Sequence, residues 1–78
     1  MSVVQRRASL DAEISKLESE RDAAQRQWND ANNYIHYYTS IGNVDGIISY
    51  RTARQSAQDT RQLLESRIEA LKAERDRL

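Results

Sequence analysis

Thr39-Ser-Ile-Gly-Asn-Val-Asp-Gly46 is the only stretch between Ser2 and Leu78 whose residues are typical of a turn that reverses the chain. Gly42 suits the left-handed conformation that often follows a helix end, and Asn43 tolerates similar angles. We expect Asp45 to cap the next helix, because its carboxylate can accept hydrogen bonds from free first-turn amides. The stretch therefore predicts two helices joined by a short loop.

The segments on both sides of this loop contain nothing that breaks a helix. Proline is absent, and the two glycines of the chain both lie in the loop stretch. At the front, Ser2-Val3-Val4-Gln5 fits a capping box. We predict helices over residues 3–41 and 46–77, within a single domain that covers residues 1–78.

Apolar residues recur along both segments at alternating steps of four and three. Such a seam, sustained over five heptads, requires a supercoiled partner, and a short loop makes the other helix that partner. The prediction is an all-α fold, an antiparallel two-helix coiled-coil hairpin. The seam positions are Val3, Arg7, Leu10, Ile14, Leu17, Arg21, Ala24, Trp28, Ala31, Ile35 and Tyr38, then Ile47, Tyr50, Arg54, Ala57, Arg61, Leu64, Ile68, Leu71, Arg75 and Leu78.

The register between the helices follows from keeping each layer of the seam apolar. Facing residue numbers that sum to about 85 place Leu17 against Ile68 and Ile14 against Leu71. A shift by one heptad would set Leu17 against Arg75, which buries a guanidinium without a partner. The preferred register leaves residues 1–7 as an overhang without an intrachain partner.

Charge and composition exclude several classes of protein. Twelve Lys and Arg balance twelve Asp and Glu, so the net charge is zero and a nucleic-acid-binding role is disfavoured. The absence of cysteine excludes a disulfide framework, and no apolar run is long enough to cross a membrane. Ten arginines against two lysines fit a GC-rich bacterial or phage genome. We expect a cytoplasmic protein that does not bind membranes.

The sequence offers no catalytic or metal-binding constellation. His36 is the only histidine and has no carboxylate one turn away on either side. Carboxylate pairs such as Glu18–Asp22 lack an accompanying Glu-x-x-His, and no phosphate-binding loop is present. We therefore expect no enzyme activity, no cofactor and no bound metal.

Self-association is expected, because five arginines interrupt the seam and the chain lacks a covalent or metal staple. A homodimer or higher oligomer, such as a four-helix bundle of two hairpins, would cover the remaining apolar residues. We expect this association to involve residues 28–50. The residues to be covered are a weak second stripe of Ala53, Leu63 and Ala70, and the loop-end residues Tyr34, Tyr37, Ile41, Val44 and Ile48. The arginines themselves are open to two interpretations, as contacts for a partner or as stems that cover the seam with their heads in water.

All five aromatic residues lie between Trp28 and Tyr50, where they accompany arginines of the second helix. Tyr, Trp and Arg are enriched at protein-binding hot spots. The candidate protein-binding residues are Trp28, Tyr34, Tyr37, Tyr38, Ile48, Tyr50, Arg51 and Arg54, together with Val3, Val4, Arg6 and Arg7 of the overhang.

Two classes of function fit these features. The first is a small regulator, inhibitor or adaptor that binds a protein through the hairpin surface. The second is a structural assembly component or co-chaperone of a larger particle, such as a virion or a secretion apparatus. Both require a protein partner that the sequence does not identify.

Overall fold

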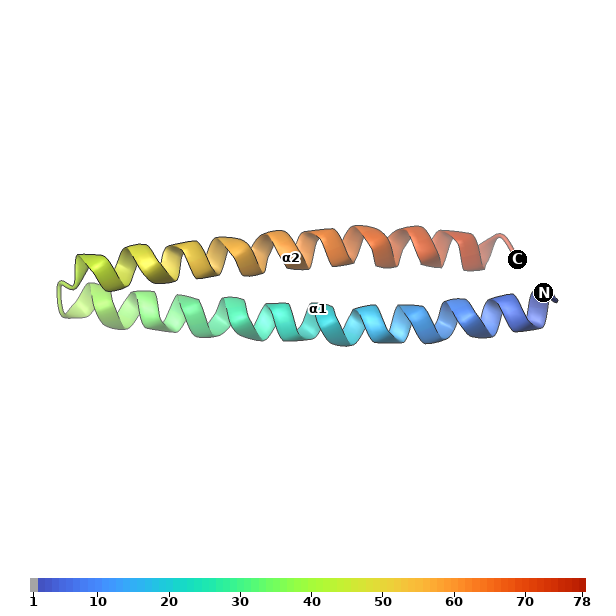
Figure 1. The fold of residues 1–78 in the computed structure, drawn as a ribbon, viewed down its shortest axis with the longest axis horizontal. Helices are drawn as coiled ribbons and strands as arrows, with labels where there is room; N and C mark the ends of the chain where they lie inside the picture. The colour runs from blue at the N-terminus through green and yellow to red at the C-terminus, as the bar shows by residue number, and fades with distance from the viewer. Residues whose placement is uncertain (1) are drawn as a thin grey trace.

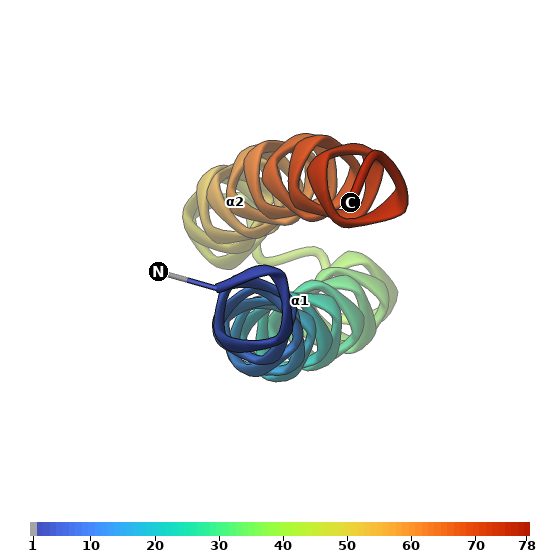
Figure 2. The ribbon, with the colours of Figure 1, turned by 90° about the vertical axis from the view of Figure 1, so that its right-hand side faces the viewer.

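The protein is a hairpin of two long antiparallel helices in the computed structural model, which describes residues 2–78 (Figure 1). Helix α1 spans Val3–Ser40 and helix α2 spans Val44–Asp76. The Cα positions extend over 59 × 14 × 14 Å, so the molecule is a rod with the loop at one end and both termini at the other. Seen along the rod, the helices wind around each other (Figure 2). The all-α hairpin predicted from the seam is confirmed.

The loop is shorter than expected, because α2 begins at Val44 rather than at residue 46. Gly42 adopts the predicted left-handed conformation with φ of 71°. Asn43 is the N-cap, and its Oδ1 accepts a hydrogen bond from the Gly46 amide at 2.9 Å. The prediction that Asp45 is the cap was wrong: the earlier start places Asp45 inside the first turn, where its charge acts only on the helix dipole.

The capping box at the start of α1 is confirmed. The Ser2 hydroxyl accepts a hydrogen bond from the Gln5 amide, and the Gln5 side chain accepts one from the Ser2 amide, both at 3.1 Å. These two bonds satisfy amides that have no partner within the helix.

The best-packed part of the seam lies toward the termini. Ile14, Leu17 and Ile68 form a buried cluster, and Leu64 and Leu71 pack against it. This grouping confirms the predicted register, because it brings together both of the expected layers. Leu10, one turn before Ile14, is fully buried as well.

The middle of the seam is made differently, with small residues under large ones. Ala24, Ala31 and Ala57 are buried, whereas the neighbouring seam residues Arg54 and Arg61 are half-buried. Their guanidinium groups stay against the hairpin: Arg61 Nε is buried, and the guanidinium carbon of Arg54 lies over the Trp28 ring.

Three arginines of the α2 seam reach across to polar residues of α1 along one edge of the hairpin. Arg54 donates to Asn32 at 2.8 Å, Arg61 to Gln25 at 3.0 Å, and Arg75 to Asp11 at 3.1 Å. In each pair the two residue numbers sum to 86, so all three bonds are consistent with the same register between the helices. These three arginine heads bond α1 of the same chain, an arrangement that neither of the two interpretations left open by the sequence had described.

The opposite edge carries two ion pairs. Arg67 bonds Glu13 at 3.2 Å, and Arg6 bonds Glu74. The prediction that residues 1–7 lack an intrachain partner was therefore wrong for Arg6. A long arginine side chain can contact a residue about one turn away from the layer of its own Cα, which a count of facing layers does not include. Met1 lies outside the described residues.

Candidate protein-binding surface at the loop end

The four tyrosines form a continuous aromatic cluster near the loop. Tyr50 of α2 stacks on two rings of α1, with centroid distances of 4.6 Å to Tyr34 and 5.6 Å to Tyr38. Tyr37 meets the Tyr38 ring edge-on at 5.2 Å. Tyr38 and Tyr50 are half-buried because they occupy seam positions. The cluster thus fixes the loop end by packing between the helices.

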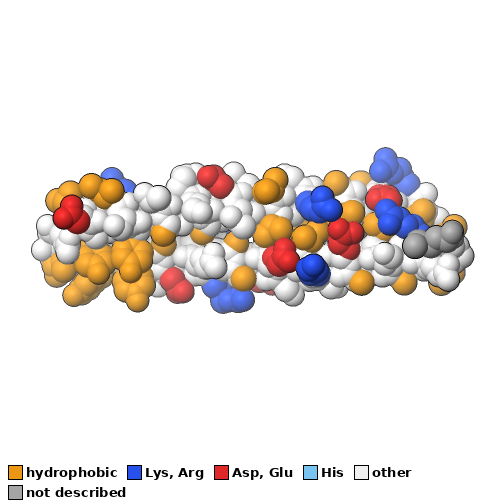
Figure 3. Space-filling view, in the orientation of Figure 1, with side chains coloured by type: hydrophobic (Ala, Val, Ile, Leu, Met, Phe, Trp, Pro, Cys, Tyr) orange, Lys and Arg blue, Asp and Glu red, His pale blue; other side chains and the backbone are white. Residues whose placement is uncertain are grey.

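Large apolar side chains remain exposed around this cluster. Figure 3 shows hydrophobic side chains gathered at the loop end of the rod. We call them the tip patch, which consists of Tyr34, Tyr37, Ile41, Val44 and Ile48, all between 49% and 63% exposed. Tyr34, Tyr37 and Ile48 were candidate binding residues from the sequence, whereas Ile41 and Val44 were expected only to be covered by self-association.

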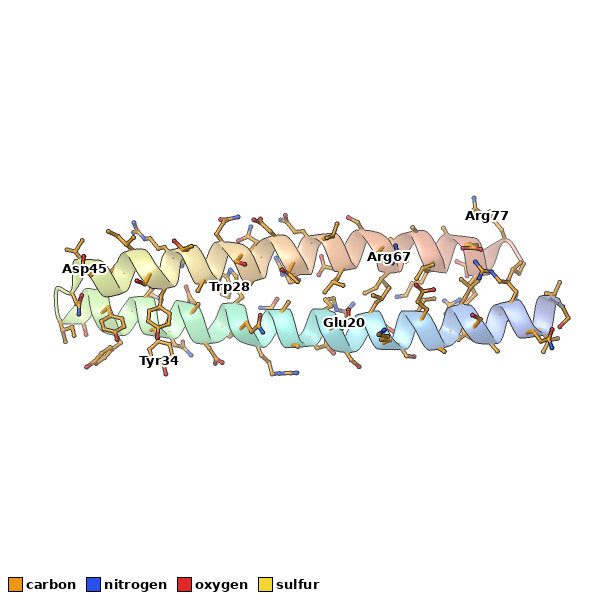
Figure 4. All side chains as sticks on the ribbon, in the orientation of Figure 1. Glu20, Trp28, Tyr34, Asp45, Arg67 and Arg77 are labelled. Atoms are coloured by element: carbon orange, nitrogen blue, oxygen red, sulfur yellow. The ribbon has the colours of Figure 1, made fainter. Side chains whose placement is uncertain are left out.

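Trp28 and Arg54, two of the candidate binding residues, contact other residues of the hairpin. The guanidinium carbon of Arg54 lies 5.9 Å from the centre of the Trp28 ring, and the same group bonds Asn32. Trp28 lies between the two helices, as Figure 4 shows. Arg51, by contrast, is exposed and lies one turn after Ile48, beside the tip patch.

The overhang candidates lie at the other end of the rod. Val3 and Val4 are 57% and 78% exposed, and Arg7 is exposed too. Because the chain termini are opposite the loop in Figure 1, the structure does not bring this group together with the tip patch. The twelve candidates therefore lie at the two opposite ends of the rod, and four of those near the loop are half-buried: Trp28, Tyr38, Tyr50 and Arg54.

An open hollow on α1 adjoins the tip patch. Its lining residues are Asp30, Asn33, Tyr34 and Tyr37, which recur at steps of three and four and so share one side of the helix. Asp30 and Asn33 were missed from the sequence, although this spacing from the tyrosines could have revealed them. The hollow offers one carboxylate and one amide beside two exposed rings.

The histidine and the carboxylates form no cluster that could bind a metal ion in the part of the chain that the structure describes. His36 is exposed on α1. Among residues 2–78, no three His, Cys, Asp or Glu side chains converge as metal ligands would. None of the described helices has an apolar stretch sufficient to cross a bilayer.

The fold and its exposed tip define a helical hairpin with an aromatic end. Comparison with known proteins finds no matching family model, no matching curated protein and no matching solved structure.

Proposed function

We propose that this hairpin is a non-enzymatic protein-binding module, a small regulator or adaptor that binds its partner through the tip patch. The observation that carries the proposal is the exposure of five large apolar side chains at one end of the rod. Several large exposed apolar side chains gathered at one end of a protein are a feature of interaction sites rather than of inert surfaces.

The tyrosine cluster makes this surface suitable for binding. Tyr34 is about half exposed, yet its ring is held by Tyr50, so little side-chain freedom remains to be lost on association. Preorganised aromatic rings contribute contact area at a low entropic cost. The exposed guanidinium of Arg51 flanks the patch and provides a polar contact at its rim.

The experiment compares two variants that remove the same kind of surface from opposite ends. Ile41→Ser/Ile48→Ser reduces the tip patch, and Val3→Ser/Val4→Ser reduces the exposed valines at the start of α1. Proteins captured from a lysate of the source cells are quantified by mass spectrometry, and the affinity of each is then measured with purified components. Circular dichroism verifies that both variants remain helical.

We expect the tip variant to lose the partner and the valine variant to retain it. Loss of the two exposed isoleucine side chains should weaken binding by about 2–4 kcal/mol, about thirtyfold or more in Kd. The reverse result would move the binding surface to the start of α1. Equal binding by the wild type and both variants would overturn the proposal.

A further inference from the structure

One lateral face of the hairpin carries an exposed leucine far from the tip patch. The Glu13–Arg67 ion pair marks this face. Lys16 lies three residues after Glu13, and Leu63 lies four residues before Arg67, so both belong to the same side of the rod. Leu63 is 73% exposed, more than any residue of the tip patch. A solitary exposed leucine needs no explanation by itself, but the residues around it are arranged symmetrically.

The symmetry is visible in steps of seven residues, which return to the same side of a supercoiled helix. On α1, Lys16 and Asp30 lie seven residues before and after Ala23. On α2, Ser56 and Ala70 lie seven residues before and after Leu63. On α1 the face therefore presents a cation, a small residue and an anion in that order. On α2 it presents a small residue, a large apolar residue and a second small residue.

The two central residues stand at the same height on the rod. Leu17 and Ile68 pack together in the buried cluster, and their residue numbers sum to 85. Because the helices are antiparallel, residues whose numbers sum to about this value stand at about the same height. The numbers of Ala23 and Leu63 sum to 86. A single two-fold axis can therefore pass beside both residues.

We propose that this lateral face binds a second copy of the chain in an antiparallel four-helix bundle. A two-fold axis that crosses the rod beside Ala23 and Leu63 places the leucines of the two copies against each other. It also places Lys16 of each copy opposite Asp30 of the other, which gives two complementary charge pairs. Ser56 of each copy faces Ala70 of the other, and these small side chains permit close approach of the helices.

Area and charge both favour overlap along the full length rather than at the loop ends. A rod 59 Å long and two helix diameters wide offers a face on the order of 1,000 Å², above the ~800 Å² per partner of a stable interface. An axis nearer the loop, beside Asp30, would instead bring the two Asp30 carboxylates together. Like charges at an interface are destabilising.

The opposite lateral face lacks these features. It is the side on which Arg54, Arg61 and Arg75 bond residues of α1. Gln55 and Gln62 of α2 are exposed on that side, where the proposed face has Ser56 and Leu63. An amide surface of this kind has less to gain from burial against a second copy.

The bundle has a geometrical consequence for the tip. An antiparallel pair points its two loops in opposite directions, so Ile41, Val44 and Ile48 of each copy stay at the ends of the assembly. The dimer goes beyond the proposed function, since its interface is centred on Ala23 and Leu63. Tyr37 lies seven residues after Asp30 on the same side of α1, so this one residue of the tip patch lies at the margin of the interface. A dimer with two tips would bind two partners or one repeated partner with increased avidity.

Cysteine cross-linking tests the position of the axis, because the chain contains no cysteine of its own. Leu63→Cys places two thiols at the axis, and Gln62→Cys is the control on the neighbouring exposed position that faces away. We expect mild oxidation to convert most of Leu63→Cys to a disulfide-linked dimer and to leave Gln62→Cys largely monomeric on a non-reducing gel.

Charge reversal tests the register. Lys16→Glu and Asp30→Lys each create two repulsive pairs, and the double variant restores attraction. Both side chains are exposed in the hairpin, so the substitutions leave each hairpin folded, as circular dichroism verifies. Sedimentation equilibrium should show a dissociation constant raised about tenfold or more by each single change and returned to near the wild-type value by the double change.

Two outcomes would overturn the proposal. One is a 9.0 kDa species for the wild type at tens of micromolar. The other is a dimer in which Gln62→Cys cross-links as well as Leu63→Cys and the double charge variant shows no rescue. The Ile41→Ser/Ile48→Ser variant should remain a dimer, so failure of the dimer and failure of the tip patch are distinguishable.

Discussion

Gly46 lies directly against the ring of Tyr38. A Cβ atom added to Gly46 would stand 2.5 Å from Cγ and 2.6 Å from Cδ1 of that ring, closer than any ordinary contact. Although Gly46 belongs to the loop stretch in the sequence, it lies inside α2, where glycine is a poor helix former. The missing side chain is what allows α2 to approach the tyrosine cluster so closely.

Gly46→Ala should therefore destabilise the hairpin despite the better helix propensity of alanine. We expect the free energy of unfolding to fall by about 1–3 kcal/mol, as for other overpacked sites. Urea denaturation at fixed protein concentration measures this change. In the Tyr38→Ala background the same substitution should become neutral or stabilising, because the clashing ring is gone. A stabilising effect in the wild-type background would contradict the close packing.

Ile68→Ala tests the buried cluster at the terminal end. Ile68 is 1% exposed and packs with Ile14 and Leu17, so the truncation should cost about 2–5 kcal/mol. Ile48→Ala is a matched control, since it is the same substitution in the same helix at a position 57% exposed. Its effect should stay within about 0.5 kcal/mol. Thermal or urea unfolding of both variants decides the point, and similar losses would contradict the assigned core.

Arg61→Met should stabilise the hairpin. The Nε of Arg61 is buried without a hydrogen-bond partner, although Nη1 bonds Gln25. Methionine keeps the stem that covers the seam and removes the unsatisfied donor, so we expect a gain of about 1 kcal/mol. Arg51→Met, at an exposed position of the same helix, should change stability much less. A loss of stability in Arg61→Met would show that the bond to Gln25 outweighs the unsatisfied group.

Asn43→Ala and Asp45→Ala separate the two candidate caps of α2. Loss of the Asn43 bond to the Gly46 amide should cost about 1 kcal/mol, with little dependence on salt. Asp45 interacts only with the helix dipole, so its replacement should cost about 0.3–1 kcal/mol in dilute buffer and less in about 1 M salt. Urea denaturation at both ionic strengths measures the difference. A larger, salt-independent loss in Asp45→Ala would restore it as the cap.

The fold could be predicted from the sequence because its determinants are local or periodic. The run from Thr39 to Gly46 ends one helix and starts the next, and the seam repeats without a slip on both sides of it. Together they determine two helices, their antiparallel arrangement and the layer that joins Leu17 to Ile68. A shift of the register by one heptad would have buried charge, so the alternatives differ greatly in energy.

The binding surface could be predicted only in part, because exposure depends on what each side chain meets in three dimensions. The sequence placed Trp28, Arg54 and Tyr37 in one group of candidates. In the structure Arg54 lies over the Trp28 ring, whereas Tyr37 remains 56% exposed. Helical periodicity gives the side of a helix on which a residue lies, but not the rotamer that turns a long side chain inward or outward.

The sequence by itself thus determined the helices, the loop and the seam, since hydrophobic periodicity and turn residues act through the chain's own geometry. Only the tertiary structure decided how the long side chains pair. Arg6 reaches Glu74, and the Tyr38 ring occupies the space that Gly46 leaves open. Such contacts join residues far apart in the chain, and their geometry is fixed only when the helices have packed together.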